Sequence, residues 1–439
     1  METLGILGLL LAIAALIFLS YKGVNAFVAS LIASAIVIAT NAMPFWSSYS
    51  TYYADGMKSF AGSYFLLFGL AAGYGELMKV SGSAESVASK LFTLFGAKWA
   101  PVACILVTLL MAMGGISAFV IIFAVYPVAA PLFKKSNITK ELMPGIFLFA
   151  SVTLCLCLPG NPTSTNALLT TPLGTNAYAA PIMGIIAGII GLVIGSIYVT
   201  YAAKKETAKG NGYIVSGTDS TEDFESDGKI LPNFFASVSP LLVVIISMLV
   251  LKNMMTTVDS INTSLLLAIA LVSLLNRNTL KGKIVSTFST GFWSSITPLM
   301  LTGGVMGFAA VVQQADGFQY FINFAMGMSD MFNPYVSAAI AVNVVAGITG
   351  TALGGLQIFS TTMLDSYLNL NINPEAFHRL MVIACCGLDT LPHCATFISM
   401  AAVCGVSIKG SYKHVLPLTV ITPIILTIVC IILATLGIV

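Results

Sequence analysis

Asp389 and His393 are the residues whose chemistry best suits proton transfer, and they lie four positions apart in the run GLDTLPHCAT within an apolar stretch. An ionisable side chain among apolar neighbours is costly to bury, so its presence there indicates a function. Loss of water favours the neutral form of an aspartate, and an imidazole titrates near neutral pH, so either group could load and release a proton. Alternatively, Asp389 caps a broken helix and His393 is its partner. Glu76 is a second acidic candidate for proton coupling.

A second polar run, LPGNPTSTN at 158–166, also interrupts an apolar stretch. Its two prolines break the helical hydrogen-bond ladder, and its hydroxyl and amide side chains can hydrogen-bond a carboxylate. Alternatively, the prolines only kink a helix whose freed backbone groups are satisfied by neighbouring helices. The candidate substrate-binding residues of the two breaks are Gly160, Asn161, Thr163, Ser164, Thr165, Asn166, Thr390 and His393.

Two runs of small residues, MGGISA at 113–118 and GITGTA at 347–352, are suited to sharp turns. We interpret them as the tips of two hairpins, which adds Ser117, Thr349 and Thr351 to the candidate substrate-binding residues. Close packing of helices through small residues is the alternative. If the tips and the breaks meet, helix N-termini and free N–H groups could hold a small anion without a buried arginine.

The composition indicates which class of protein positions these residues. The chain has 439 residues, of which 57% are hydrophobic and only 8% are charged, and its mean hydropathy is +0.96. A soluble fold could not cover its surface with so few polar side chains, so most of the surface must face lipid. The expected fold class is therefore an all-α polytopic membrane protein. The length allows roughly ten to thirteen hydrophobic helices and no separate soluble domain.

Several other functions are not expected. A net charge of +2 without basic runs argues against nucleic acid as a partner. The eight cysteines lie mostly in apolar stretches, where a thiol packs as a small hydrophobic group, and no spacing indicates a metal site or another cofactor. Asp389 and His393 lack a nearby nucleophile or metal set, so we do not expect an enzyme. The other two histidines, His378 and His414, fall near loop ends and are expected to be interfacial.

The hydrophobic segments fall into two halves around a polar linker. We expect a first membrane repeat at 1–203, a linker at 204–231 and a second, inverted membrane repeat at 232–439. The linker contains Lys, Glu, Asp, Gly and Ser in proportions that cannot form a core. A duplication is indicated by similar runs at matching places, since GGIS at 114–117 aligns with AGIT at 346–349.

The distribution of basic residues predicts the orientation. With the N-terminus outside and the linker cytoplasmic, roughly 16 of the 19 Lys and Arg residues lie on the cytoplasmic side, and Lys58, Lys252 and Arg379 lie outside. This sorting requires 99–133 and 333–362 to be re-entrant hairpins, which leaves about ten transmembrane helices, five in each half. An odd number of spans inverts the second half relative to the first, as is typical of secondary transporters.

Six runs of residues around the breaks are distinctive: GLDTLPH at 387–393, NPE at 373–375, HR at 378–379, PGNP at 159–162, Asn166 and GTNAYAAP at 174–181. They resemble the two signatures of the gluconate permease (GntP) family of proton symporters, within the ion transporter superfamily of inverted-repeat carriers. The resemblance extends over essentially the whole chain, because the length and the order of hydrophobic segments also fit.

The resemblance implies import of gluconate or related sugar acids, or of small hydroxy acids such as 3-hydroxybutyrate, by proton symport across the bacterial cytoplasmic (inner) membrane. It places Gly160 to Asn166 and Asp389 to His393 in the substrate and coupling site, near the hairpin tips. The superfamily relationship implies a homodimer with a scaffold domain and a transport domain that moves as a rigid body, which is an elevator-type motion. A sodium-coupled carboxylate symporter and a passive anion channel or facilitator remain the alternatives, because broken helices can also coordinate sodium or line a pore.

Overall fold

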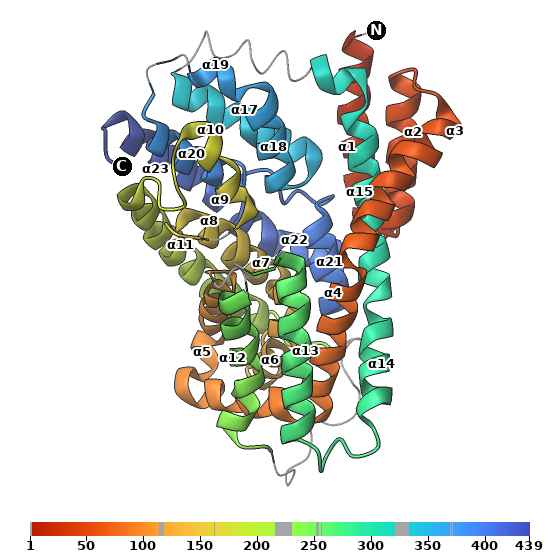
Figure 1. Ribbon diagram of the computed structural model, residues 1–439, viewed down its shortest axis with the longest axis vertical. Helices are drawn as coiled ribbons and strands as arrows, with labels where there is room; N and C mark the ends of the chain where they lie inside the picture. Colours follow the sequence, from red (N-terminus) through yellow and green to blue (C-terminus); the bar gives the residue numbers. More distant parts are fainter. Residues whose placement is uncertain are drawn as a thin grey trace.

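Helices make up the regular structure that the chain shows in Figure 1. The computed structural model describes residues 2–113, 118–161, 163–215, 231–251, 254–255, 257–320, 333–368, 370 and 372–439. Within these residues no strand is present, so the predicted all-α class is confirmed. The same residues contain five helical segments long and apolar enough to cross a membrane: Leu4–Tyr21, Lys140–Cys157, Pro181–Ala208, Ile284–Gln313 and Ile408–Thr435.

The helices before and after the linker have the following bounds. Those of the first half are α1 (Glu2–Tyr21), α2 (Ala26–Thr40), α3 (Phe45–Ser47), η1 (Ser48–Tyr53), α4 (Ala54–Val80), α5 (Ser83–Met113), α6 (Ala118–Lys135), η2 (Lys140–Leu142), α7 (Met143–Leu148), η3 (Phe149–Leu154), α8 (Cys155–Cys157), α9 (Ser164–Leu168), α10 (Thr170–Leu173) and α11 (Pro181–Ala208). Those of the second half are α12 (Phe234–Leu251), α13 (Thr257–Leu275), α14 (Ile284–Ser294), α15 (Ile296–Gln313), α17 (Pro334–Thr349), α18 (Ala352–Thr362), α19 (Leu364–Leu368), α20 (Pro374–Ala384), α21 (Ala395–Cys404), α22 (Ile408–Leu416), η5 (Pro417–Ile421) and α23 (Thr422–Thr435).

The long helix α11 illustrates how the sequence separates lipid-facing and buried surfaces. Its exposed large side chains recur with helical spacing and are apolar, namely Ile182, Ile185, Ile189, Val193 and Ile197. On the opposite face, a Cβ on Gly184 would meet the Cys157 carbonyl oxygen, and one on Gly195 would meet the ring of Phe149. These glycines let α11 pack closely against α8 and η3, while its other face is left to hydrocarbon.

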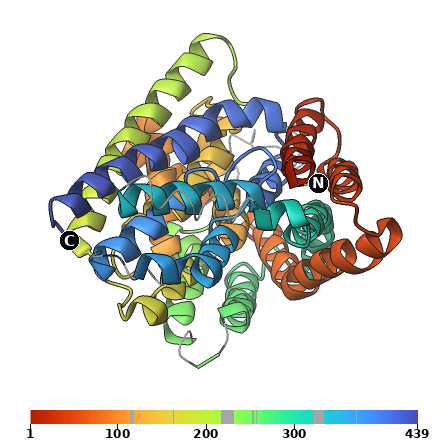
Figure 2. The same ribbon diagram turned by 90° about the horizontal axis from the view of Figure 1, so that it is seen from above.

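The helices form two groups, which are visible in both views (Figures 1 and 2). In one group α4 packs along α14 and α15, and α15 also packs against α2, which pairs with α1. The other group contains α7, α8, α11, α20 and α23, together with the segments in which helices break. Contacts of α4 with α6 and of α15 with α21 join the two groups. Figure 2 shows the N- and C-termini on opposite sides of the molecule.

Two packed helix pairs occupy the positions predicted for re-entrant hairpins. The helix α5 packs along α6, and α17 packs along α18. Figure 1 shows α17 and α18 toward the end that carries the N-terminus, and α5 and α6 toward the opposite end. The predicted tip of the first pair, at 114–117, lies outside the described residues, whereas the tip of the second pair is described.

Both predicted helix breaks are present. The helix α8 ends at Cys157, and the chain returns to a helix only at Ser164. The helix α20 ends at Ala384, and the chain returns to a helix only at Ala395. In the first break Gly160 has a φ of +75°, a left-handed conformation that other residues rarely adopt. The backbone groups of both segments must therefore find partners elsewhere in the fold.

Candidate functional site

The tip of the second hairpin contacts the second helix break. Gly350 ends α17 with a φ of +66°, and Thr351 is extended before α18 begins at Ala352. A Cβ on Gly350 would lie 3.1 Å from Cδ2 of His393 and 3.6 Å from the Cα of Cys394. The sharp turn predicted from the small residues is thus found at Gly350, where it places the tip against the second break.

Asp389 and His393 face opposite kinds of helix end at this tip. The carboxyl group of Asp389 faces the backbone N–H of Ala352 at the start of α18. The ring of His393 faces the carbonyl groups of Gly347 and Ile348 at the end of α17. A helix N-terminus attracts negative charge and a C-terminus attracts positive charge, so the two helix dipoles complement an acid on one side and a base on the other.

Both side chains are buried and incompletely hydrogen-bonded. Asp389 is 4% exposed and His393 is 1% exposed. Within the part of the chain that the structure describes, Oδ1 of Asp389 and both ring nitrogens of His393 lack a partner with hydrogen-bond geometry. Buried polar atoms in proteins are normally paired, so these atoms are available to a proton, a substrate or water.

Two helix N-termini without side-chain caps add backbone donors to the site. Thr351 precedes α18 and Cys394 precedes α21, and neither side chain caps its helix. The first N–H groups of a helix have no acceptor within that helix, so such ends can bind an anion. Because Gly350 brings the two ends into contact, they can hold a small carboxylate next to Asp389 and His393.

Two further polar residues surround the second break. Thr390 is buried, and its hydroxyl lies 3.0 Å from the carbonyl oxygen of Thr419, in the π-helical segment η5. Such π-helical turns are frequent at functional sites. Asn343 on α17 is absent from the predicted site residues, yet its amide adjoins Gly387, and its buried Oδ1 has no partner among the described residues. A lone asparagine within an apolar helix is the sequence signal that could have identified it.

The amides of the first break stabilise their own loop. Asn161 donates from Nδ2 to the Leu158 carbonyl at 2.8 Å, and its Oδ1 accepts from the Thr163 hydroxyl at 2.6 Å. Asn166 donates from Nδ2 to the carbonyls of Asn161 and Ala177, at 2.9 and 3.1 Å. In this conformation Asn161, Thr163 and Asn166 therefore position the loop and leave few polar atoms for a substrate.

Arg379 on α20 fixes the first break from the second half of the chain. Its fully buried guanidinium donates to four main-chain carbonyls at 2.9 to 3.4 Å, those of Leu156, Leu158, Ala177 and Ala179. The expectation of a site without a buried arginine is therefore wrong at the first break, whereas the outer side of the membrane for Arg379 stays a prediction. The end of α8 and the loop before α11 supply carbonyl groups without helical partners, and these can solvate a buried cation.

His378 takes part in the same contact. Its Nε2 lies 3.0 Å from the Asn166 carbonyl oxygen, and its Nδ1 lies 2.6 Å from the Thr175 hydroxyl. His378 and His414, which the sequence predicts to be interfacial, are both buried within the protein. The helix α20 already begins at Pro374 and turns His378 inward. Since α20 then leads into the second break, it links the two breaks directly.

The hairpins bring the two breaks into one region. The helix α18 of the second hairpin packs against α9, which follows the first break. At the end of α5, the Met113 sulfur lies 3.9 Å from the Cys155 sulfur, just before the first break. The second hairpin therefore contacts both breaks, and the described end of the first hairpin approaches the first break.

The remaining residues predicted for the substrate site belong to the loop of the first break, to α9 and to the predicted hairpin tips. Ser117 and the side chain of Ser164 lie outside the described residues. Thr165 is buried on α9. Thr349 is buried, and its hydroxyl bonds back to α17. Gly160 uses its N–H within the loop, where it donates to a carbonyl after α10 at 2.9 Å. The Thr349 hydroxyl and the Gly160 N–H are thus used within the hairpin tip and the loop.

Substituting Gly350 with alanine should distort the hairpin tip and slow transport. An alanine in the left-handed region costs roughly 1–2 kcal/mol, and its Cβ would lie 3.1 Å from the His393 ring. If that strain is relieved by moving the tip, initial uptake into membrane vesicles should fall about fivefold or more. Gly282→Ala is the matched control, because Gly282 has a φ of +75° and no described atom within 4 Å of a Cβ. Equal uptake in both variants would show that the contact with His393 is unimportant.

A multi-pass helical membrane protein with broken helices around buried polar residues is the class that this fold and site define. A comparison with protein families matches residues 4–436 with the family described as GntP family permease. The chain belongs to the GntP permease family and is therefore a membrane transporter. The resemblance identified from the sequence is confirmed over nearly the whole chain.

Two of the individual proteins that are similar to this chain illustrate the family and the fold comparison. One is "Uncharacterized transporter YxjC" of Bacillus subtilis (strain 168), with 30% identity over 457 residues that cover 94% of this chain and 95% of the relative. The other is the YdaH transporter of Alcanivorax borkumensis, whose crystal structure is described as revealing an unusual topology. That similarity covers 88% of each chain at 15% identity, with a TM-score of 0.37.

Proposed function

We propose that this permease imports a small hydroxylated carboxylate, such as a gluconate-like sugar acid or a short hydroxy acid, by proton symport. One observation carries the proposal: Asp389 and His393 are buried with unpaired polar atoms where the hairpin tip at Gly350 meets the second break. The uncapped starts of α18 and α21 would hold the carboxylate group. Asp389 and His393 would carry the proton.

Competition between Asp389 and the substrate carboxylate for the same N–H groups would couple proton binding to substrate binding. An ionised Asp389 and a substrate carboxylate both require the start of α18, and two neighbouring anions repel each other. Protonation of Asp389 removes this repulsion and makes its oxygens weaker acceptors for the N–H groups, so the substrate binds well only to the protonated site. His393 lies at the carbonyl end of α17, where it could pass a proton to Asp389 through water or a substrate hydroxyl.

The environment of Arg379 supports the proton over sodium as the coupling ion. Sodium sites in transporters with broken helices use unwound backbone carbonyls. Four carbonyls around the first break already accept hydrogen bonds from the Arg379 guanidinium. A fixed positive charge at this place would also repel a second cation. Sodium coupling and passive conduction are nevertheless separate outcomes of the assay described below.

An inverted repeat and an elevator-type motion complete the proposal. The order of helices supports the repeat. In the first half, α1, α2 and α4 are followed by the pair α5–α6 and the first break. In the second half, α12, α13 and α14–α15 are followed by the pair α17–α18 and the second break. The motion is supported by the grouping of helices, since both breaks lie in one group and α1, α2, α4 and α15 lie in the other. The repeats would be 1–203 and 232–439, with about ten spans, in a homodimer in the bacterial inner membrane. The N-terminus would be outside and the linker 204–231 cytoplasmic.

Uptake into proteoliposomes tests the proposed function. Purified protein is reconstituted, and accumulation of labelled gluconate, lactate and 3-hydroxybutyrate is followed under an inward proton gradient. For one-to-one symport of a proton and a monoanion, a gradient of one pH unit should support about tenfold accumulation. Protein-free liposomes control for leakage of the protonated acids.

Three other results would each contradict part of the proposal. Accumulation driven by a sodium gradient in place of the proton gradient would refute proton coupling. Equilibration without accumulation would identify a passive facilitator. Uptake of none of the carboxylates, by protein that retains its fold, would refute the substrate class.

A further inference from the structure

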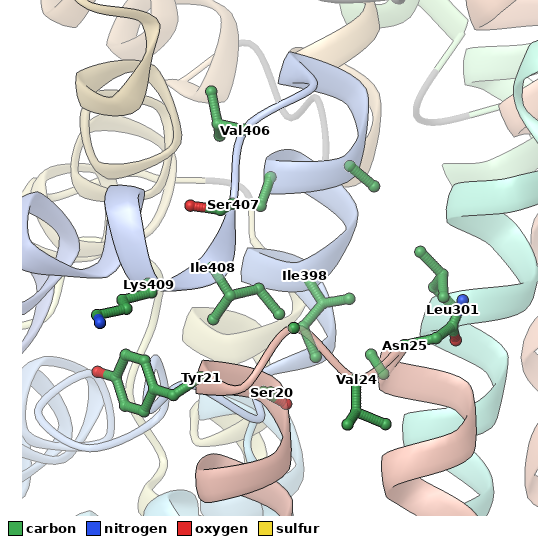
Figure 3. Close-up of a pocket in the computed structure, with 14 residues that line it drawn as sticks. Ser20, Tyr21, Val24, Asn25, Leu301, Ile398, Val406, Ser407, Ile408 and Lys409 are labelled. Carbon is green, nitrogen blue, oxygen red and sulfur yellow. The ribbon is translucent and has the colours of Figure 1, made fainter. Parts of the chain in front are cut away.

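A separate cavity lies between the first two helices and the segment after the second break. It has a volume of about 300 Å³, which is in the range of small-ligand pockets. Its walls come from the turn between α1 and α2, from α15, and from α21 with the start of α22 (Figure 3). None of the residues predicted for substrate binding or proton coupling lines it. The cavity is therefore distinct from the proposed transport site.

The polar part of this cavity is suited to an anion. The cavity is lined by Ser407, Ile408 and Lys409 at the start of the nine-residue helix α22. The Ser407 Oγ accepts from the Gly410 N–H at 3.0 Å, and the N–H groups of Ile408 and Lys409 have no acceptor within the helix. Figure 3 shows the Lys409 ammonium and the Tyr21 hydroxyl directed to the same edge of the cavity. The start of α22, the Lys409 ammonium and the Tyr21 hydroxyl together provide several hydrogen-bond donors. No acidic residue is among the side chains that line the cavity.

A buried hydroxyl independently indicates that a ligand belongs here. Ser20, the second-last residue of α1, lines the cavity and is only 3% exposed. Its Oγ has no hydrogen-bond partner among the described residues. A serine in a helix usually bonds to a neighbouring carbonyl or to solvent, so an unpaired buried hydroxyl at a cavity wall indicates a missing polar group.

The rest of the wall is apolar, which restricts the class of ligand. Val24, Leu301, Ile398 and Ile408 face the cavity and offer nothing to the hydroxyls of a sugar acid. A ligand with one anionic group and an apolar chain would satisfy both parts of the wall. The orientation predicted from the sequence places Lys22 and Lys409 on the cytoplasmic side, where anionic phospholipids attract basic residues.

We propose that this cavity binds an anionic phospholipid. The phosphate would lie at the start of α22, between Lys409, Tyr21 and the Ser20 hydroxyl, and an acyl chain would lie along Val24 and Ile398. Because the cavity joins α1, α2 and α15 to α21 and α22, the lipid would bridge the two groups of helices.

Native mass spectrometry of the purified full-length protein tests the proposal. Phosphatidylglycerol should bind more tightly than phosphatidylcholine of the same chain length. Lys409→Gln should weaken phosphatidylglycerol binding about fivefold, which corresponds to the contribution of one basic residue near an anionic lipid. Lys281→Gln, which removes an exposed lysine between α13 and α14, should leave binding unchanged. Ser20→Ala should weaken binding without changing the net charge.

Several results would overturn the proposal. Equal binding of the two lipids, or equal binding by Lys409→Gln and Lys281→Gln, would show that the cavity does not recognise an anionic headgroup. Binding of soluble glycerol 3-phosphate as tightly as phosphatidylglycerol would identify a free anion as the ligand. Ala402→Trp should fill the cavity and prevent lipid binding, and retained binding in this variant would place the lipid elsewhere.

Discussion

Replacing Asp389 with asparagine should abolish proton-driven accumulation and leave exchange of the substrate across the membrane intact. Asparagine keeps the size of the side chain but cannot ionise. The amide oxygen could still accept from an N–H group at the start of α18 but would carry no negative charge at any pH, so the substrate carboxylate would bind without a proton. Under a gradient of one pH unit, accumulation should fall from about tenfold to none, whereas counterflow of labelled substrate should continue and lose its dependence on pH.

Asp365→Asn is the matched control for this change, because it removes the same charge from an exposed residue on α19. Accumulation in the control should equal that of the wild type. If Asp389→Asn still accumulates substrate, the proton is carried by Glu76 or His393 instead. If exchange is lost together with accumulation, Asp389 caps α18 structurally and the proposed competition is incorrect.

The two helix breaks could be predicted because their causes are local. Proline removes a backbone donor wherever it stands in a helix, and Gly350 permits a left-handed turn whatever surrounds it. Burial of Asp389 and His393 could also be predicted, because a long apolar run on both sides leaves an ionisable residue no route to water. These inferences require only the neighbouring residues in the chain.

Arg379 and Asn343 could not be placed in the same way, because their partners are distant in the sequence. The carbonyls that surround Arg379 come from 156–158 and 177–179, and they converge only when α11 folds back against α8. Counting basic residues takes each arginine as a charge in a loop on one side of the membrane, so it could not indicate that Arg379 is buried among carbonyl groups. Asn343 is brought to the second break only by the contact between α17 and Gly387.

Replacing Arg379 with leucine should destabilise the protein more than any other single change considered above. It would remove the guanidinium donors from the buried carbonyls of Leu156 and Ala179, and each unpaired buried group costs about 1–3 kcal/mol. The carbonyls of Leu158 and Ala177 would keep their donors within the loop. Arg379→Lys should retain the positive charge but should still lower the stability of the fold. One ammonium cannot reach the carbonyls of both 156–158 and 177–179 as a planar guanidinium does. The unfolding temperature of the purified protein in detergent, together with uptake, measures both effects.

Arg277 provides the control, since it is the only other arginine in the chain and is exposed after α13. Arg277→Leu and Arg277→Lys should unfold at the wild-type temperature. If Arg379→Lys is stable but no longer transports, the loop of the first break folds without the guanidinium donors. The guanidinium would then act mainly by aligning the two breaks. A stable and active Arg379→Leu would show that the first break holds its shape without α20, and the direct link between the two breaks would have to be abandoned.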